Sequence, residues 1–387
     1  MHQSPYKENF GIYIHWPFCI SKCPYCDFNS HVREAVDSQR WQNALLTEMG
    51  YFAARTQGRI VESIFFGGGT PSLMEAKTVE ALIHQASQYW NLSSNLEITL
   101  EANPNSVDTQ RFQDFKSAGI NRVSIGIQSL DNQALKFLGR KHNRDEAITA
   151  IKTAANVFER FSFDLIYSRP NQSVESWRQE LNEALTHARD HLSLYQLTIE
   201  PGTAFHTLYQ RKEFVLPDQD SGANLYEMTQ EMLENAGMPS YEISNHARSG
   251  SECRHNMIYW RYQDYIGIGP GAHGRLSVNG QKTAIRCLKA PESWLETVEK
   301  TGQGIHEEVI LTDDDKINEM LMMGLRLVEG ISIDRFHAQT GSNLLEIVNH
   351  QQLQRLIEGD FLLISGGFLK ATPMGRQRLN SVLSALL

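Results

Sequence analysis

The first half of the chain alternates short apolar stretches with longer segments of helical spacing. Stretches rich in β-branched and aromatic residues predict six strands, at 11–16, 61–68, 96–103, 122–129, 161–168 and 192–200. Apolar residues recurring every three or four positions predict the helices between them, at 34–57, 75–89, 108–118, 131–159 and 174–188. This order predicts an α/β fold with a parallel sheet. Six units are too few to close a TIM-like barrel, so we expect a partial (β/α)6 barrel; a doubly wound sheet is the alternative.

The second half of the chain has a different pattern. Residues 205–290 are less regular and include a glycine-rich loop at 267–274. Helical spacing returns from about residue 291, and residues 361–372 predict a hairpin that turns on Gly366-Gly367. Helices followed by such a hairpin predict a small winged-helix-like domain. The expected division is a barrel at 1–250, a connecting region at 251–290 and a C-terminal helical domain at 291–387.

Polar residues follow the apolar part of several predicted strands. Glu101, Gln128, Asp164 and Thr198 each stand at or near the end of a different strand. In a parallel barrel the carboxyl ends of the strands build the active site. These four residues therefore predict a functional site at one edge of the sheet.

Composition narrows the class of protein. The chain has 387 residues, 41% of them hydrophobic, which suits about two globular domains. A formal net charge of -9 argues against a protein that binds the nucleic-acid backbone. No apolar run approaches the roughly 18 to 20 residues of a membrane span, and the polar N-terminal stretch does not resemble a secretory signal. We therefore expect a cytoplasmic protein.

Cys19, Cys23 and Cys26 hold three of the five cysteines in a C-x3-C-x2-C pattern. Such clustering favours a metal site in a reducing compartment over a disulfide framework. Structural zinc sites usually take four ligands in two separated pairs, and no second C-x2-C is present. Three thiolates can instead hold a [4Fe–4S] cluster and leave one iron open for a ligand. The lone Cys253 and Cys287 are expected to be structural thiols.

Two glycine-rich stretches are candidate ligand loops. Residues 65–72, "FFGGGTPS", follow a predicted strand and lack the Gly-Lys-Ser/Thr of a phosphate loop. They are either a loop whose backbone meets a ligand or a simple strand-to-helix turn. Residues 267–274, "GIGPGAHG", resemble a dinucleotide fingerprint, but Pro270 disrupts its spacing, so NAD is not expected.

The cysteine spacing, with Tyr25 before the last cysteine, resembles the signature of the radical S-adenosylmethionine (SAM) superfamily. There, SAM chelates the open iron, and its reductive cleavage yields methionine and a 5′-deoxyadenosyl radical. The ordered motifs "CPYCDFNSH", "GGGTPS", "EANP", "SIGIQS", "LGRKH" and "DLIY" resemble the oxygen-independent coproporphyrinogen III oxidase family over essentially the whole chain. Within that family, the chain is more similar to the HemW branch of haem chaperones than to the oxidase HemN.

This resemblance implies a set of cofactor residues. It implies a [4Fe–4S] cluster on Cys19, Cys23 and Cys26, and SAM contacts from Tyr13, Gly68 and Glu101. Positions that contact a second SAM in the oxidase correspond here to Tyr25, Gly69, Thr70, Gln128, Arg140, Asp164 and Thr198. Taken singly, Arg140 is also explained as a helix-end cation and Asp164 as a strand-end cap.

Three features depart from the oxidase pattern. The oxidase has C-x-C after its third cysteine, where this chain has Asp27-Phe28. Only about ten residues precede the first predicted strand, where the oxidase has a longer segment that bears on substrate binding. Both branches usually have Tyr-Gly-Leu-Pro where this chain has Tyr167-Ser168-Arg169-Pro170, which alters one loop beside the cofactor.

The motif His255-Asn256-x-x-Tyr259 is shared with the haem-chaperone branch, where it is implicated in haem binding. Imidazole and phenolate are both known haem-iron ligands, and residues four apart share one face of a helix. The alternatives are a core histidine beside a core tyrosine, or ligation by His31, His142 or His273.

The resemblance implies a chaperone that binds haem and delivers it to haem-dependent acceptor proteins, membrane-associated ones among them. It assigns no catalytic residue, and whether SAM is cleaved is left open, as is the oligomeric state. The alternative is an oxidase that converts coproporphyrinogen III to protoporphyrinogen IX. The residues Asp27-Phe28 and the short N-terminal segment favour the chaperone.

Overall fold

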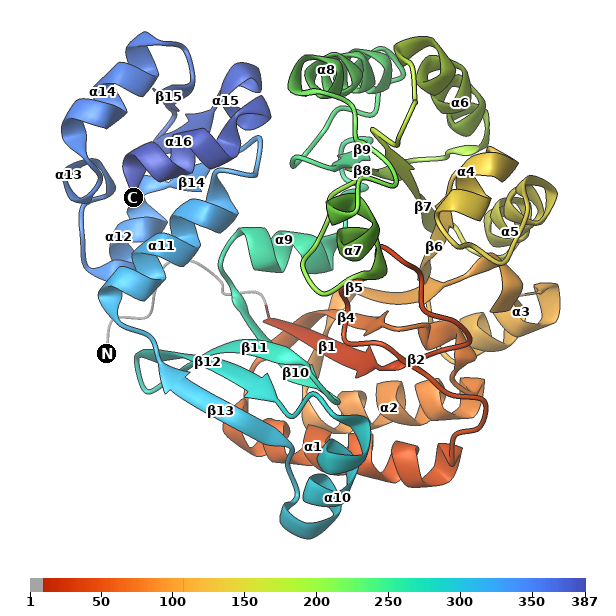
Figure 1. Cartoon of the computed structure of the whole chain (residues 1–387). Coiled ribbons are helices and arrows are strands. Elements are labelled where there is room, and N and C mark those ends of the chain that lie inside the picture. Colours follow the sequence, from red (N-terminus) through yellow and green to blue (C-terminus); the bar gives the residue numbers. More distant parts are fainter. Residues whose placement is uncertain (1–9, 107) are drawn as a thin grey trace.

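A computed structural model describes residues 10–106 and 108–387 (Figure 1). The polar N-terminal stretch considered above lies outside these residues except for Phe10. All six predicted strands are present, as β1 (Phe10–Trp16), β4 (Ile60–Gly68), β5 (Asn91–Ala102), β6 (Arg122–Gln128), β7 (Arg160–Tyr167) and β8 (His191–Gln196). They pair in parallel in this order, which confirms the predicted parallel sheet and excludes the doubly wound alternative.

The sheet is larger than the sequence predicted, with eleven strands among the described residues. Its additional members are β9 (Asn245–Ala247), β10 (Asp264–Ile268), β11 (His273–Val278), β12 (Gln281–Cys287) and β13 (Ile305–Ile310). The expected glycine-rich loop is present but shorter than 267–274: the ends of this range belong to β10 and β11, and the chain turns between them, with Gly269 and Gly271 at φ of 105° and 77°. Among the described residues the edge strands β9 and β13 do not pair, so the barrel is open.

Helices cover the outer side of the curved sheet (Figure 1). They are α1 (Ser38–Arg55), α2 (Ala76–Tyr89), α3 (Thr109–Ser117), α4 (Asn132–Phe137), α5 (Arg144–Val157) and α6 (Val174–His187). The single helix predicted at 131–159 is wrong. Gly139, at φ 67°, follows the end of α4, and Asn143 starts α5 with a capping box that includes Glu146.

Shorter elements connect the strands at the carboxyl edge and beyond β8. They are β2 (Phe18–Cys19), β3 (His31–Val32), the 3-10 helices η1 (Pro71–Leu73) and η2 (Pro104–Ser106), and the helices α7 (Ala204–Gln210), α8 (Gln219–Asn235), α9 (Arg254–Trp260) and α10 (Pro291–Thr301). The strands β2 and β3 form a two-stranded parallel sheet of their own.

The C-terminal unit has its own hydrophobic core. It contains α11 (Asp313–Gly324), β14 (Ile331–Ser332), α12 (Ile333–Thr340), α13 (Leu344–Ile347), α14 (His350–Glu358), β15 (Leu362–Ser365), β16 (Phe368–Ala371), α15 (Pro373–Gln377) and α16 (Leu379–Leu386). The predicted hairpin is confirmed, because β15 and β16 pair across Gly366-Gly367, which have φ of 60° and 80°. The domain boundary at 291 stays a prediction; Trp294 of α10 packs in the core of the large sheet.

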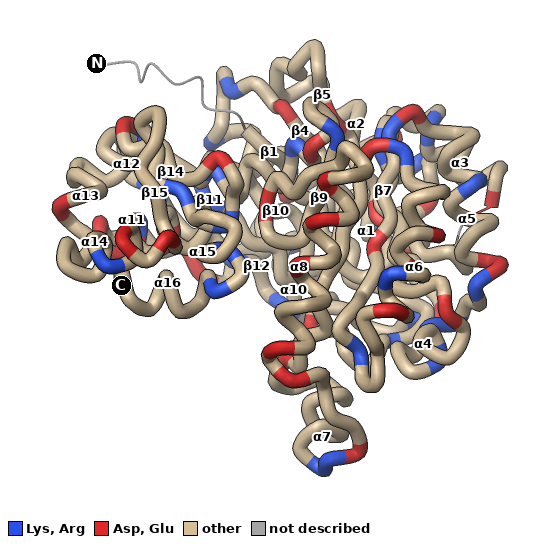
Figure 2. Tube along the Cα trace, turned by 90° about the horizontal axis from the view of Figure 1, so that it is seen from above, with Lys and Arg blue, Asp and Glu red and all other residues tan. Residues whose placement is uncertain are grey.

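Charge is distributed over the whole surface. Figure 2 shows Lys and Arg interspersed with Asp and Glu along the chain, with no long basic stripe in this view. Within the described ranges, no helix combines the length and the apolar character that a membrane span requires.

A buried carboxyl group ties three distant parts of the barrel together. Glu48 of α1 is fully buried and accepts the backbone N–H groups of Gly269 and Gly304, each at 2.7 Å. It also accepts the indole N–H of Trp294 at 3.1 Å. Burial raises the pKa of Glu48 to about 7. The side chain therefore connects α1 to the turn after β10 and to the segment before β13.

We expect Glu48→Ala to lower the free energy of unfolding by about 3 kcal/mol, because three buried N–H donors lose their acceptor. Chemical denaturation measures this change. Glu80→Ala, at an exposed position on α2, is the matched control and should change stability by less than about 0.5 kcal/mol. Equal effects of the two substitutions would contradict the assigned role of Glu48.

Candidate functional site

The three clustered cysteines lie on one loop, residues 17–33, which we call the cluster loop. It leaves the end of β1, passes through β2 and returns through β3. Asn29 anchors the loop, because its side-chain amide donates to the carbonyl groups of Pro270 and Lys289, each at 2.9 Å. The loop is thus held against the turn that follows β10.

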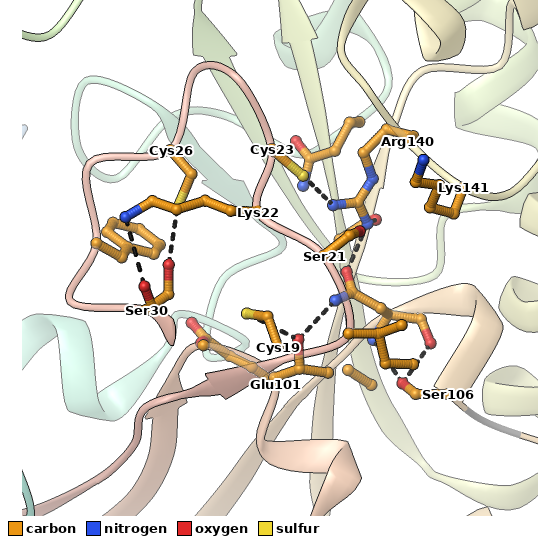
Figure 3. Close-up of a pocket in the computed structure, with 18 of the residues that line it drawn as sticks. Cys19, Ser21, Lys22, Cys23, Cys26, Ser30, Glu101, Ser106, Arg140 and Lys141 are labelled. Atoms are coloured by element: carbon orange, nitrogen blue, oxygen red, sulfur yellow. Dashed lines mark hydrogen bonds between the residues drawn. The ribbon is translucent and has the colours of Figure 1, made fainter. Parts of the chain in front are cut away.

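Each thiol has a polar neighbour of its own (Figure 3). The hydroxyl of Thr70 donates to Cys19 Sγ at 3.4 Å, and Arg140 Nη1 donates to Cys23 Sγ at 3.4 Å. Cys26 Sγ lies 3.8 Å from the hydroxyl of Ser30. Burial raises the pKa of Cys19 and Cys26. Donors directed at the sulfur atoms favour the thiolate form that a metal requires.

The donor set suits an iron–sulfur cluster. In the part of the chain that the structure describes, no group of three or more His, Cys, Asp or Glu side chains converges on one metal ion. A [4Fe–4S] cluster takes its thiolates on separate irons, so three spaced thiols on one loop fit it, with the fourth iron left to a ligand.

One pocket joins the cluster loop to the strand ends. The predicted residues that line it are Cys19, Cys23, Tyr25, Cys26, Gly68, Gly69, Thr70, Glu101, Gln128, Arg140 and Asp164. The structure thus brings together the residues that the sequence placed after β4, β5, β6 and β7. Their roles stay predictions.

The predicted residues Tyr13, Thr198, His255 and Tyr259 do not line this pocket. The hydroxyl of Tyr13 lies 2.9 Å from His15 Nδ1, and His15 Nε2 lies 2.9 Å from the carbonyl oxygen of Asn29. Tyr13 therefore supports the cluster loop through His15.

Gly68 and Gly69, at the end of β4, are required by the packing of the backbone, which the sequence analysis did not anticipate. A Cβ atom on Gly68 would lie 2.6 Å from the His15 ring, and one on Gly69 would lie 2.7 Å from the carbonyl oxygen of Phe18. Gly69 N–H donates to the carbonyl of Trp16 at 2.7 Å, and Thr70 N–H donates to that of Phe18 at 2.8 Å. The glycines are needed so that this turn can approach the cluster loop.

Two half-buried carboxyl groups face the pocket from neighbouring strands. The backbone N–H of Gly68 donates to Glu101 at 3.1 Å, and the hydroxyl of Ser124 donates to Asp164 at 3.4 Å. Burial raises the pKa of Glu101 to about 8, and Asp164 raises it further. Burial raises the pKa of Asp164 to about 6. Such a pair suits a cationic ligand, because a positive charge restores the ionised form.

Arg140 and Gln128 form the opposite wall. Arg140 donates to the side chain of Asn103 and to the carbonyl of Gly126, but its buried Nε has no partner among the described residues. Gln128 has φ of 72°, a left-handed conformation that is uncommon outside glycine. An unpaired donor and a strained residue at one pocket are features that a bound ligand explains.

Sequence reasoning missed two parts of this site. Asn103, in the quoted motif "EANP", donates to the hydroxyl of Thr70 at 3.0 Å and so connects β5 to the glycine turn. The helix α7 was not predicted, yet Phe205 N–H donates to the carbonyl of Pro24 at 2.8 Å, and the Phe205 ring packs against Tyr25. The signal for α7 was its N-cap, Thr203.

The predicted pair in the HNxxY motif meets on one face of α9. His255 is buried, with Nδ1 2.7 Å from the hydroxyl of Ser63 and Nε2 2.5 Å from that of Tyr259. Burial lowers the pKa of His255 to about 3. Both imidazole nitrogens are occupied, so ligation of haem iron requires one of these hydrogen bonds to break.

Two family models match the chain. The model of the radical SAM superfamily matches residues 13–184, and that of the HemN C-terminal domain matches residues 311–378.

Curated relatives match over nearly the full length. The haem chaperone HemW of Escherichia coli is 38% identical over 97% of this chain and 98% of its own. HemW of Haemophilus influenzae is 37% identical over 99% of both chains. Radical S-adenosyl methionine domain-containing protein 1, mitochondrial, of Mus musculus is 38% identical over 97% of this chain and 87% of its own.

Among solved structures, coproporphyrinogen III oxidase (HemN) of E. coli superposes with a TM-score of 0.81 over 98% of this chain and 90% of its own. At 20% identity this likeness shows the fold. The pocket at the strand ends, the three-cysteine loop and the full-length relatives lead to one assignment: the chain belongs to the radical SAM superfamily and, within its coproporphyrinogen III oxidase family, to the HemW branch.

Proposed function

We propose that this protein is a haem chaperone, which binds haem and passes it to haem-dependent acceptor proteins. The observation that carries the proposal is the similarity to HemW relatives over 97% or more of this chain. Those relatives are named haem chaperones, and the cargo and the acceptors come to this chain only by that similarity. We keep the cytoplasm as the predicted location; some relatives are named mitochondrial.

The proposal includes a [4Fe–4S] cluster on Cys19, Cys23 and Cys26. The cluster, when bound, would supply an open iron for the amino and carboxylate groups of SAM. The side chains of Thr70, Arg140 and Ser30 lie next to the three sulfur atoms and would compensate the charge of the thiolates. The loop geometry thus supports a cluster whose three thiolates contact protein side chains and whose open iron faces the pocket.

SAM would occupy the pocket between the cluster loop and the strand ends. Glu101 and Asp164 would face its positive charge, and the unpaired Nε of Arg140 would donate to an acceptor group of the ligand. Gln128 and the backbone after Gly68 would complete the wall. A second SAM, as implied for the oxidase, is not part of the proposal.

The alternative function is oxidation of coproporphyrinogen III. The structural likeness to HemN concerns the fold and does not decide between the two. Phe28 stands where the oxidase pattern has a further cysteine, and its side chain is 59% exposed at the edge of the pocket. A thiol that the oxidase pattern requires is therefore replaced by an exposed phenyl ring, which favours binding over turnover.

We expect the anaerobically reconstituted protein to bind haem and to form no protoporphyrin from coproporphyrinogen III. Orientation of a substrate against its reactant supplies much of an enzyme's rate, and about 1 Å of misplacement costs on the order of a hundredfold. Haem binding is measured from the Soret band, and oxidation is measured by porphyrin fluorescence with SAM and a reductant. Sustained turnover would contradict the chaperone proposal and support the oxidase alternative.

The cluster assignment is tested by single Cys→Ser substitutions. Cys19→Ser, Cys23→Ser and Cys26→Ser should each lose most of the iron and sulfide, because each removes a thiolate ligand. Mössbauer spectroscopy and metal analysis provide the readout. Cys287→Ser is the control, since this buried thiol donates to Glu48 and a hydroxyl can do the same. Tightly bound zinc in place of iron would refute the cluster.

The two carboxyl groups predict a pH dependence for SAM binding. With a pKa of about 8, Glu101 stays largely protonated near neutral pH, whereas Asp164, with a pKa of about 6, loses its proton below pH 7; raising the pH from 6 to 9 therefore ionises both and makes the pocket more negative. The affinity for SAM should therefore rise on the order of tenfold between about pH 6 and about pH 9.

Calorimetric titration of the reconstituted protein measures this dependence. Glu101→Gln should flatten most of it, because the amide keeps an acceptor for Gly68 N–H but does not ionise. The exposed Glu80→Gln should retain it. A wild-type affinity that is constant over this range would show that SAM does not bind against these carboxyl groups.

A further inference from the structure

We propose that Asn103 raises the reduction potential of the iron–sulfur cluster, because it holds the two side chains that donate hydrogen bonds to Cys19 and Cys23. This inference rests on the proposed function, since it requires the [4Fe–4S] cluster on the cluster loop. Asn103 directly follows the end of β5, and it acts on the sulfur atoms through Thr70 and Arg140. It is therefore a positioning residue and not a ligand.

The side-chain amide of Asn103 connects two donors that lie on different elements. Its Nδ2 donates to the hydroxyl of Thr70 at 3.0 Å, and its Oδ1 accepts from Nη2 of Arg140. A guanidinium has donors and no acceptor, so the amide oxygen faces Arg140 and the NH2 group faces Thr70. The chemistry of the two partners thus fixes the orientation of the amide.

The contact with Asn103 sets the direction of the Thr70 hydroxyl. A hydroxyl has a single proton to donate. The amide of Asn103 occupies an acceptor position of the hydroxyl oxygen, and the hydroxyl proton is directed at Cys19 Sγ, with the oxygen 3.4 Å from the sulfur. Thr70 is buried, so water has little access to this group. Asn103 thus helps to select Cys19 as the acceptor.

Asn103 and the backbone of β6 together orient the guanidinium of Arg140. Nη2 donates both to Oδ1 of Asn103 and to the carbonyl of Gly126, while Nη1 donates to Cys23 Sγ at 3.4 Å (Figure 3). A guanidinium is planar and rigid, so two acceptors on Nη2 also fix the direction in which Nη1 points. Removal of one acceptor frees the group to turn away from Cys23.

The backbone of Asn103 is itself held in place. The hydroxyl of Ser106 accepts the N–H of Asn103 at 3.3 Å and donates to its carbonyl at 2.8 Å. The N–H of Ser106 donates to the same carbonyl at 3.0 Å, and the hydroxyl of Ser72 lies 2.6 Å from that of Ser106. Pro104 restricts the conformation of the residue before it. The amide therefore projects from a fixed point toward both partners.

Hydrogen bonds to the sulfur atoms are among the factors that set the reduction potential of an iron–sulfur cluster. Reduction adds one electron and makes the cluster more negative, so such donors stabilise the reduced form more than the oxidised form. Cys19 and Cys23 receive their donors from side chains that Asn103 holds, whereas Cys26 has Ser30 beside it. Asn103 thus acts on two of the three thiolates at once.

The midpoint potential of the reconstituted full-length protein tests this assignment. The cluster is reduced with dithionite in the presence of redox mediators and without SAM, and the reduced form is followed by electron paramagnetic resonance. Asn103→Leu keeps the approximate size of the side chain and removes both hydrogen bonds. At a given potential it should lower the ratio of reduced to oxidised cluster about tenfold, which for a one-electron couple is a shift of about 59 mV to more negative values.

Further variants separate positioning from a general disturbance of the site. Thr70→Val removes the donor to Cys19 and should shift the potential in the same direction. The double variant should shift it by less than the sum of the single shifts, because Asn103 acts in part through Thr70. Asn91→Leu makes the same change at the exposed amino end of β5 and should keep the wild-type potential. Iron and sulfide content are measured for every variant.

The outcomes separate this inference from the proposed function. If the wild type takes up no cluster, the proposed cluster fails and the inference with it. If Asn103→Leu keeps its iron and the wild-type potential, the inference is refuted while the cluster stands. Strictly additive shifts in the double variant would also overturn it. If Asn103→Leu takes up no iron, Asn103→Ala, which adds no bulk, is measured in the same way. Loss of iron from both would assign Asn103 to assembly of the site and refute a role in the potential.

Discussion

The site depends on one close contact between two backbones. The cluster loop and the glycine turn after β4 approach within hydrogen-bond distance twice, from Gly69 to Trp16 and from Thr70 to Phe18. A side chain on Gly68 or Gly69 would overlap the cluster loop or the His15 ring. Thr70 can therefore reach Cys19. Without this contact, the three thiols would not stand against the ends of the parallel strands.

The interior of the barrel differs in charge compensation between its two ends. At the amino end, Glu97 is fully compensated: it pairs with Arg160 at 2.6 Å and accepts the backbone N–H of Arg254 at the start of α9. At the carboxyl end, Glu101 and Asp164 share few donors, and burial raises the pKa of both. A buried carboxyl group whose donors do not offset its burial is stabilised by a proton or by a cationic ligand. The open end is therefore the binding end.

The sequence predicted what local patterns determine. Apolar strands with polar residues at their ends placed Glu101, Gln128 and Asp164 on one edge, because parallel strands share a direction. The cluster loop could be predicted from the C-x3-C-x2-C spacing of its cysteines alone.

Long-range contacts could not be predicted in the same way. Glu48 has an ordinary position in a helix, and its three N–H donors lie more than 200 residues away. The strands β10 to β13 form because they extend an existing sheet, and none of them was predicted: a loop was expected at 267–274 and helical spacing from about residue 291. The motif of His255 and Tyr259 predicted their contact correctly, but not that Ser63 of β4 would occupy the second nitrogen.

One departure from the family pattern shows how the pocket wall is held. Where the pattern has glycine, Ser168 has φ of 58°, a conformation that costs about 1 kcal/mol or more outside glycine. The next residue, Arg169, replaces an apolar residue of the pattern, and its guanidinium is buried against Glu180 and the hydroxyl of Ser129.

A buried ion pair offsets its desolvation only when further hydrogen bonds satisfy it. Here Glu180 also accepts the N–H of Leu130 at 2.8 Å, so Arg169 and Glu180 together fix residues 129 and 130. These residues directly follow Gln128, whose left-handed backbone faces the pocket. At the second of these two substituted positions, an anchored ion pair thus takes the place of an apolar side chain, and it fixes the two residues that follow the left-handed Gln128.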